Sequence, residues 1–419
     1  MKFPCTMRIA FVSYEYPPDT ALGGIATYVA QISRCLAAAG AHVEVFCGST
    51  SRTETSIETS GVVVHRVKST RSAFPTAVVQ GFIQQYRKQP FDVLEGPDFL
   101  AEARYVVRAL PQLPYVVKLH TPYFFARKFG RFPFSREQFR NQMRLLWYVA
   151  KTRNVRALAG TDDPIFREER NHLLDADEIA APSQAIADII IGAWGADPAR
   201  VSLVPYTYEP PAEMLCIPVE TDTQRISFVG RLEWRKGVQD LAPAIPVIFE
   251  RNPQARFRFV GAWSASPKAG VNMRDFLCSQ IDPKYHDRLE FTGKVPLTSI
   301  PLYLADTDIC VFPSRWESFG FVVLEAMSAG RAVVCTGNGG MAELVDQGKY
   351  GMLVPPQSPR DIADRVNALL ASPEMRHEMG RRARTEGLRR FSASAVVPTQ
   401  LRSYERAIAR RQEALARVG

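Results

Sequence analysis

The stretch DICVFPSRWESFGFVVLEAMSAGRAVVCT, residues 308–336, contains the pattern that decides the fold. An apolar run, ICVFP, is followed by a loop with one glycine, an apolar segment of helical length and a second apolar run, AVVC. Short apolar runs that alternate with helices are typical of parallel strands buried on both faces. The stretch therefore predicts a strand–helix–strand unit of a doubly wound α/β sheet.

The same alternation of apolar runs and helical segments extends over the chain in two series. The first series has apolar runs at residues 7–14, 42–48, 61–67, 91–96, 115–120, 176–183 and 201–206, and the second has them at 225–230, 256–261, 289–293, 308–314, 331–336 and 351–355. Residues 207–224 lie between the two series; they are rich in proline and lack periodicity, as linkers do. We therefore expect two parallel sheets, with ligands bound at the carboxyl ends of their strands in a cleft between the halves.

The composition indicates a cytosolic globular protein. A length of 419 residues exceeds one ordinary core, so two domains of roughly 200 residues each are expected. The seven cysteines are odd in number and scattered through apolar runs, which indicates reduced thiols. No segment approaches the roughly 18 apolar residues that are needed to cross a bilayer. We expect a cytoplasmic location, with adhesion to the inner face of the membrane left open.

A basic segment makes such adhesion conceivable. The chain carries 52 basic and 43 acidic residues, and residues 127–156 contain one acid, Glu137, among many basic residues. Arg136, Arg140 and Arg144 recur every four residues beside an apolar stripe, which predicts a basic amphipathic helix. Its basic face is either simply solvated or in contact with anionic lipid or an acidic substrate. Nucleic acid is not expected as a partner, because no zinc-ligand spacing or aromatic signature accompanies the charge.

Three longer motifs resemble a known family. SFVGRLEWRKG at residues 227–237, the segment 291–345 and YGMLVPPQSPRDIADRV at 350–366 look like the carboxy-terminal half of the retaining GT-B glycosyltransferases of family 4, also called glycosyl transferases group 1. GGIATYVAQISRCLAAAGAHVEVF at residues 23–46 is similar to their acceptor domain.

The resemblance implies a GT-B fold, in which two doubly wound Rossmann-like domains face a central cleft. The expected divisions are an acceptor-binding domain at 1–206, a linker at 207–224, a donor-binding domain at 225–395 and a final helix at 396–419 that crosses back to the first domain. Helices are predicted near residues 359–371, 373–390 and 399–415, with Pro398 interrupting the start of the last one.

Positive charge is required where a nucleotide sugar is broken, because negative charge develops on the leaving diphosphate. Arg231 and Lys236 lie five residues apart in a loop after a strand, so both can converge on one diphosphate without a metal ion. Gly23 and Gly24 precede the first long helix, and Gly320 opens the helix after Glu317. Such glycines let main-chain N–H groups approach an anion closely.

Two acids, Glu317 and Glu325, are separated by one glycine. In one continuous helix their carboxylates would lie about 12 Å apart and roughly 80° out of register, so they could not share a metal ion or a proton. We expect Glu317 in the loop that leaves the strand and Glu325 in the first turns of the helix. The resemblance implies that Glu317 touches the sugar ring and that Glu325 holds the ribose hydroxyls.

The remaining candidates are implied by position and resemblance. His120 ends the strand YVVKLH, and the resemblance implies a role near the donor sugar, with a structural histidine as the alternative. Lys294 and Val295 look like the segment whose main chain meets the base. The acids at 306–308 lie at the entrance of a strand, opposite the ligand end, so no metal site is expected. The predicted catalytic residues are His120, Glu317, Arg231 and Lys236; the predicted donor-binding residues are Gly23, Gly24, Arg231, Lys236, Lys294, Val295, Glu317, Ser318, Phe319, Gly320, Phe321 and Glu325.

The function that the resemblance implies is retaining hexosyl transfer. A hexose, with glucose favoured, moves from a nucleotide sugar, with UDP favoured over GDP, to a hydroxyl of a carbohydrate or lipid-linked acceptor, in cell-surface polysaccharide or glycolipid assembly. No further cofactor is expected. The alternatives are a GT-B epimerase or phosphorylase and a non-catalytic nucleotide-sugar-binding protein. A dinucleotide-dependent dehydrogenase is excluded, because SYEYPPDTALGG after the first strand is not G-x-G-x-x-G.

Overall fold

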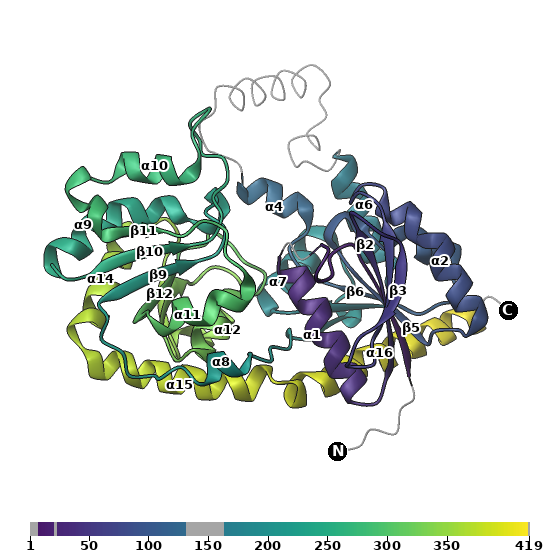
Figure 1. Ribbon diagram of the computed structural model, residues 1–419. Coiled ribbons are helices and arrows are strands. Elements are labelled where there is room, and N and C mark those ends of the chain that lie inside the picture. Colours follow the sequence, from purple (N-terminus) through teal and green to yellow (C-terminus); the bar gives the residue numbers. More distant parts are fainter. Residues whose placement is uncertain (1–6, 21–22, 131–162, 418–419) are drawn as a thin grey trace. The chain divides into compact units, whose positions relative to one another are not determined.

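The computed structural model describes residues 7–20, 23–130 and 163–417 (Figure 1). Contacts divide the chain into two compact units. Unit 1 comprises Met1–Phe124, Asp162–Glu209 and Arg390–Gly419, and unit 2 comprises Phe125–Thr161 and Pro210–Arg389.

Unit 1 is built on an eight-stranded sheet with the order β3-β4-β2-β1-β5-β6-β7-β8. Its strands are β1 (Arg8–Ser13), β2 (His42–Ser49), β3 (Glu54–Ile57), β4 (Val63–Lys68), β5 (Val93–Pro97), β6 (Tyr115–Lys118), β7 (Glu178–Ala181) and β8 (Val201–Leu203). All pairs are parallel except β3 with β4, so the predicted doubly wound sheet is confirmed. Strand β3 was not predicted, because its sequence ETSI is largely exposed at the edge of the sheet and carries no apolar run.

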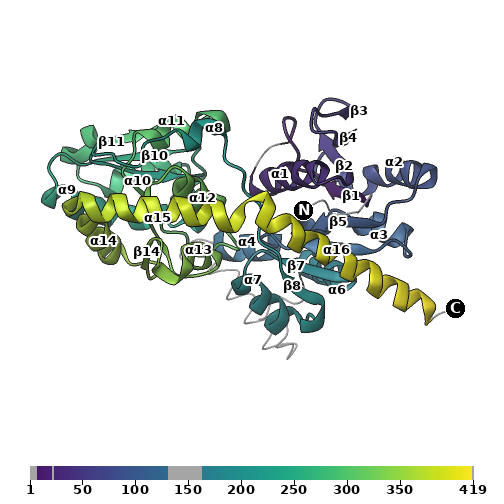
Figure 2. The ribbon, with the colours of Figure 1, turned by 90° about the horizontal axis from the view of Figure 1, so that it is seen from below.

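Helices cover this sheet, and the last helix of the chain is one of them. The helices are α1 (Gly24–Ala38), α2 (Phe74–Lys88), α3 (Arg104–Ala109), α4 (Tyr123–Gly130, at the unit boundary), α6 (Pro164–Leu174), α7 (Gln184–Ile189) and α16 (Ala393–Ala416). Figure 2 shows α16 running along β5 and β7, and it also contacts α1 and β6. The prediction that Pro398 interrupts this helix was wrong: the helix begins at Ala393 and runs through the proline. Burial of Val397, Leu401 and Tyr404 against the rest of unit 1 compensates for the backbone hydrogen bond that proline cannot donate.

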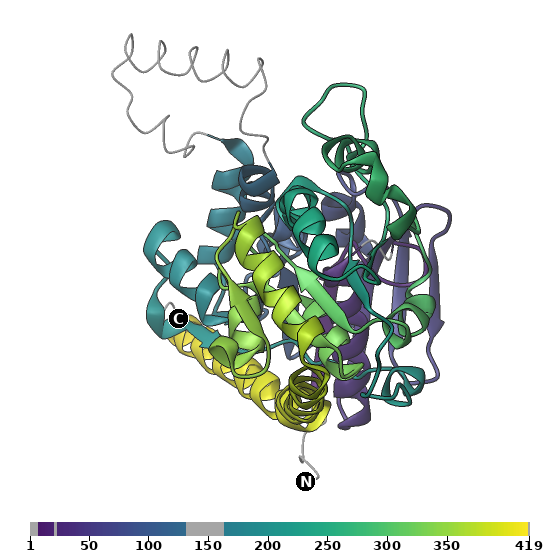
Figure 3. The same cartoon turned by 90° about the vertical axis from the view of Figure 1, so that its left-hand side faces the viewer.

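Unit 2 is built on a six-stranded parallel sheet with the order β11-β10-β9-β12-β13-β14. Its strands are β9 (Arg225–Val229), β10 (Arg256–Val260), β11 (Leu289–Phe291), β12 (Ile309–Phe312), β13 (Ala332–Thr336) and β14 (Met352–Val354). Its helices are α8 (Ala212–Leu215), α9 (Leu241–Arg251), α10 (Met273–Gln280), α11 (Ile300–Ala305), α12 (Phe321–Ser328), α13 (Gly340–Leu344), α14 (Pro359–Ala371) and α15 (Pro373–Phe391). Figure 3 looks onto this unit and shows helices flanking the sheet. The strand order reverses between β9 and β12, which is where open α/β sheets bind ligands.

Most of the predicted linker belongs to unit 2. The short helix α8 forms within it, and two buried arginines hold the residues that follow. Arg331 donates to the carbonyl oxygens of Pro218 and Val219, and Arg376 donates to Thr221 O at 2.9 Å. These bonds satisfy backbone groups that a loop would otherwise leave to water. The chain changes unit between residues 209 and 210, well before the linker ends.

Among the described helices, none combines the length and the apolar character that a membrane span requires.

Candidate active site

Two loops meet at the carboxyl edge of the unit 2 sheet, at the point where the strand order reverses. One loop, residues 230–237, follows β9, and the other, residues 313–320, follows β12, the neighbour of β9 in the sheet. The main chain joins them, since Arg315 N donates to Arg235 O at 2.9 Å. Side chains from both loops therefore share one small region.

Alternating charges connect these loops in a continuous series, which we call the ion-pair ladder. Arg231 lies 3.4 Å from Glu233, and Glu233 also accepts from Arg235 at 2.9 Å. Arg235 then contacts Glu317 at 3.0 Å, and Lys236 Nζ lies 2.5 Å from the same Glu317 oxygen, Oε1. The ladder holds three cations and two carboxylates, so its net charge is positive and suits an anion.

Glu317 is buried but ionised. Burial raises the pKa of a carboxyl group, but Arg235 and Lys236 outweigh that effect and lower the pKa of Glu317 to about 2. Both cations bind Oε1, and Oε2 has no hydrogen-bond partner among the residues that the structure describes. The site thus keeps one carboxylate oxygen as an acceptor for a ligand.

Close backbone packing fixes the position of Glu317. Gly340 N donates to Glu317 O at 2.8 Å, and a Cβ atom on Gly339 would lie 2.3 Å from that same oxygen. A Cβ atom on Gly340 would lie 2.2 Å from Ser318 O. No side chain fits at either distance, so the glycine pair is required for the Glu317 loop to lie where it does.

The placement of the two acids follows the prediction. Glu317 lies in the loop, and Glu325 lies in α12, which begins at Phe321 after Gly320 with φ of 109°. Burial raises the pKa of Glu325 to about 7, with Lys236 acting in the opposite direction. Glu325 therefore titrates near neutral pH, whereas Glu317 stays charged.

The other predicted donor residues of unit 2 occupy the same edge of the sheet. Ser318 and Phe319 are buried between Glu317 and α12, and Phe321 contacts Phe319 edge to face at 5.8 Å between ring centroids. Lys294 is exposed and Val295 is half-buried in the loop after β11. All of them follow strands of one sheet at its carboxyl edge.

Sequence reasoning missed two residues at this edge, Arg235 and Trp263. In GRLEWRKG two cations are adjacent, and the sequence does not reveal that the Arg235 side chain turns to Glu317 as Lys236 does. Trp263 follows β10, pairs through its main chain with Leu232, and its ring lies 3.6 Å from the Cβ position of Gly293. Its exposed fraction of 37% is large for tryptophan, which was a signal only the structure could give.

The remaining predicted residues belong to unit 1. His120 is buried just past β6, and Gly23 and Gly24 lie exposed at the start of α1. Of the predicted basic segment, residues 131–156 lie outside the described residues.

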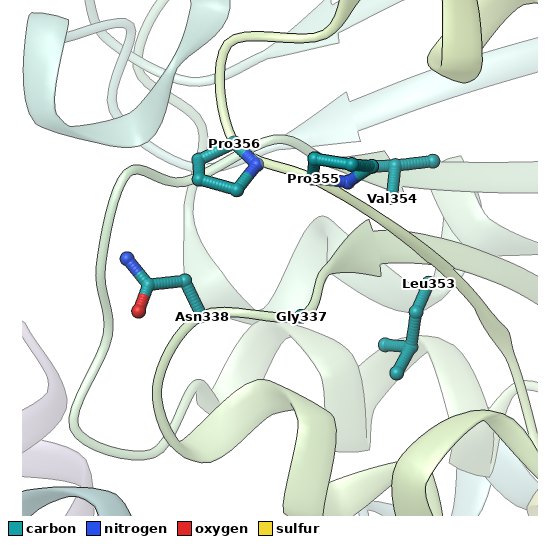
Figure 4. A pocket seen from close by; sticks show the side chains of 6 residues that line it. All are labelled: Gly337, Asn338, Leu353, Val354, Pro355 and Pro356. Carbon is teal, nitrogen blue, oxygen red and sulfur yellow. The ribbon is translucent and has the colours of Figure 1, made fainter.

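A separate open pocket of about 590 Å³ lies where β13 and β14 end. Figure 4 shows Pro355 and Pro356 facing Gly337 and Asn338 across it. Asn338 Nδ2 donates to Arg315 O at 2.7 Å, so the pocket adjoins the loop that carries Glu317. None of the predicted site residues lines it.

The acids at 306–308 lie at the entrance of β12, where the sequence places them. Asp308 accepts from the main-chain N–H groups of Thr223 and Gln224, at 3.1 and 2.8 Å, at the amino end of β12. Within the described ranges, no group of three His, Cys, Asp or Glu side chains is arranged to hold a metal ion.

Comparison with known proteins identifies relatives for both units. Residues 217–386 match the family model Glycosyl transferases group 1, and residues 23–207 match the Glycosyl transferase 4-like domain. The chain is 28% identical over 436 residues to a D-inositol 3-phosphate glycosyltransferase of Pseudarthrobacter chlorophenolicus, covering 96% of each chain.

Solved structures show the same fold. Sucrose-phosphate synthase from Thermosynechococcus elongatus is similar with a TM-score of 0.72 and 22% identity, covering 96% of this chain and 99% of that one. Anabaena HepE in complex with UDP is similar with a TM-score of 0.66 and 19% identity, covering 95% of this chain and 100% of that one.

Proposed function

The chain belongs to the glycosyl transferase group 1 family and has its GT-B fold, and from this premise we propose that it is a retaining hexosyltransferase with UDP-glucose as donor. Because the chain belongs to this family, it is a glycosyltransferase, and the donors that the family uses are nucleotide sugars. The UDP complex of HepE supports UDP as the first nucleotide to test, ahead of GDP. The acceptor that we propose is a hydroxyl of a carbohydrate or a lipid-linked sugar, in cell-surface polysaccharide or glycolipid assembly.

The observation that carries this proposal is the ion-pair ladder around Glu317. Arg231 is 65% exposed and weakly paired, so it can turn to a phosphate without breaking a buried contact. Lys236 can share its ammonium group between Glu317 and a second anion, because it has three donors. Together they can stabilise the charge that develops on the departing diphosphate, which is the role that a metal ion serves in many transferases.

The two acids bind hydroxyl groups in this proposal. Oε2 of Glu317 accepts a hydrogen bond from a hydroxyl of the sugar ring, and Glu325 accepts from the vicinal hydroxyls of the ribose. In the reaction, the bond from the anomeric carbon to the phosphate oxygen breaks and a bond to the acceptor oxygen forms on the same face. The acceptor proton passes to the departing phosphate. Because the acceptor attacks on the face that the phosphate leaves, the anomeric configuration is retained.

The test begins with binding in the presence of EDTA. Thermal shift with UDP, GDP and their hexose derivatives identifies the nucleotide, and the full chain is then incubated with the best donor and a panel of glycosides, sugar phosphates and lipid-linked sugars. We expect UDP to raise the melting temperature and the product to carry the anomeric configuration of the donor.

Other outcomes assign the site differently. Interconversion of the donor without an acceptor identifies an epimerase, and phosphate-dependent release of a sugar phosphate identifies a phosphorylase. Binding without turnover over the whole panel identifies a non-catalytic protein. A melting temperature that no nucleoside diphosphate changes contradicts the proposal itself.

A further inference from the structure

The ring of His120 in unit 1 is held on several sides. Asp98 Oδ1 accepts from His120 N at 3.0 Å, which fixes the main chain at the end of β6. The Tyr28 ring packs edge to face against it at 5.3 Å between centroids, and the Tyr206 ring lies tilted against it at 5.1 Å. The ring therefore has little freedom to rotate.

The hydrogen bonds of Tyr206 determine which ring nitrogen of His120 carries the proton. The Tyr206 hydroxyl lies 2.7 Å from Leu119 O and 2.6 Å from His120 Nδ1. A carbonyl oxygen only accepts, so the single hydroxyl proton goes to Leu119. The hydroxyl oxygen must then accept from His120, which places a proton on Nδ1.

The imidazole is neutral, so Nε2 carries no proton. Burial and the nearby charge of Lys118 hold the pKa of His120 well below its usual range. Nε2 has no hydrogen-bond partner among the residues that the structure describes. His120 is buried, with 5% of its surface exposed. Nε2 is thus a lone-pair acceptor whose natural partner is a hydroxyl, because phosphate and carboxylate oxygens have no proton to donate.

Tyr206 is itself fixed by its surroundings. Its ring lies 4.7 Å from that of Tyr28, and the Lys118 ammonium group sits 5.0 and 5.3 Å from these two rings. Lys118 Nζ donates to Val204 O at 2.5 Å, two residues before Tyr206, and Tyr28 donates to Glu95 at 2.8 Å. A fixed tyrosine of this kind can hold a tautomer of its neighbour.

We propose that Tyr206 is a positioning residue that keeps His120 in the Nδ1–H tautomer and so presents Nε2 as a permanent acceptor for a substrate hydroxyl. The identity of that hydroxyl as part of a sugar rests on the proposed function. The tautomer rests on the hydrogen bonds of Tyr206 and on the burial of His120.

The tautomer is measured directly by long-range ¹⁵N–¹H correlation spectra of the full chain labelled at histidine. The signal of His120 is identified by its loss in His120→Gln. We expect a pattern with a protonated Nδ1 and an unprotonated Nε2 in the wild type, and a mixture of tautomers in Tyr206→Phe. An Nε2–H pattern in the wild type, or an unchanged spectrum in Tyr206→Phe, overturns the proposal.

Tyr115→Phe provides the matched control. Tyr115 is the first residue of β6, the strand that precedes His120, and it is fully buried. Its hydroxyl lies 2.5 Å from Nε2 of another histidine, His172. Loss of this bond at the opposite end of β6 should shift the His172 signal and leave the His120 signal and the transfer rate unchanged.

Kinetics then connect the tautomer to the reaction. We expect Tyr206→Phe to lower kcat roughly tenfold with little change in donor KM, which is the loss of about one hydrogen bond. In the His120→Gln background the same substitution should have no further effect, since Tyr206 acts through His120. Additive losses, or an equal loss in Tyr115→Phe, contradict the proposal. If the wild-type chain has no transferase activity, the proposed function is contradicted, and so is the identification of the hydroxyl as part of a sugar. The spectra still test the tautomer in that case.

Discussion

Substitution of Glu317 by Gln is the most informative perturbation, because its magnitude follows from the ion-pair ladder. The pKa of Glu317 falls from 4.5 to about 2 under the influence of burial opposed by Arg235 and Lys236. One pKa unit corresponds to about 1.4 kcal/mol, so ionised Glu317 contributes about 3 kcal/mol to stability at neutral pH. For a unit of roughly 200 residues, that loss lowers the melting temperature by about 6–12 °C.

The pH dependence of this effect has a definite sign. A carboxyl group whose folded pKa is depressed stabilises the fold at pH values above its unfolded pKa, near 4.5, and loses that contribution as the pH falls toward the folded value near 2. The difference in melting temperature between the wild type and Glu317→Gln should therefore be full at pH 7 and shrink between about pH 5 and pH 3.

Differential scanning fluorimetry over this pH range measures the effect. Glu220→Gln is the control, because Glu220 pairs with Arg381 on an exposed surface where such a pair contributes little. A change below 2 °C at pH 7, or a difference that does not depend on pH, would falsify the assignment of Glu317 as a buried ion held by two cations. Transfer activity should also be lost, since the amide cannot reproduce the charge at Oε2.

Other substitutions test separate parts of the donor site. Glu325→Gln should abolish a rise in UDP affinity between pH 6 and pH 8, measured by calorimetry, because ionisation of Glu325 near pH 7 adds an acceptor for the ribose; a rise that persists in the variant assigns the titration to another group. Arg231→Ala should weaken UDP binding without lowering the melting temperature, because Arg231 is largely exposed. Lys236→Ala should lower both the affinity for UDP and the melting temperature, because Lys236 pairs with the buried Glu317. Equal changes of the melting temperature in the two variants would contradict this difference in burial. Trp263→Ala should weaken UDP binding roughly tenfold if the base stacks on its exposed ring, and unchanged affinity places the base elsewhere. Arg331→Met should increase hydrogen exchange of residues 217–222, because the carbonyl groups of Pro218 and Val219 lose a donor; protection equal to the wild type would show that Arg331 does not hold the segment.

The fold was predictable because both sheets are parallel and buried. Such strands appear in the sequence as short apolar runs, and every run that we singled out forms a strand. Features without that signature were missed: β3 is a polar edge strand, and the predicted final helix begins earlier, at Ala393, and continues through Pro398 because of contacts that are distant in sequence. The attachment of residues 218–222 to unit 2 depends on Arg331 and Arg376, which lie more than 100 residues further along the chain.

The candidate site was predictable in position and less so in detail. Gly320 marks the boundary between loop and helix. The sequence therefore places Glu317 in the loop and Glu325 in the helix, as the structure does. The partners of Glu317 were not predictable, because a pattern of adjacent charges does not say which side chain turns inward. Residue spacing predicts which side chains lie at the carboxyl edge of the sheet, but only the packed structure shows which of them form ion pairs.

The double pairing of Glu317 explains how one site can hold both an anion and a carboxylate. If Lys236 were the only partner, a diphosphate that attracted its ammonium group would leave Glu317 buried without compensation, and the pKa of the carboxyl group would rise. Arg235, in the same loop as Lys236, binds the same oxygen of Glu317 and also pairs with Glu233 at 2.9 Å. It can keep Glu317 ionised while Lys236 serves the phosphate. We infer that the two adjacent cations have separate roles: Lys236 binds the diphosphate of the donor, and Arg235 keeps Glu317 ionised. Glu317 therefore remains an acceptor for the donor sugar while the diphosphate is bound.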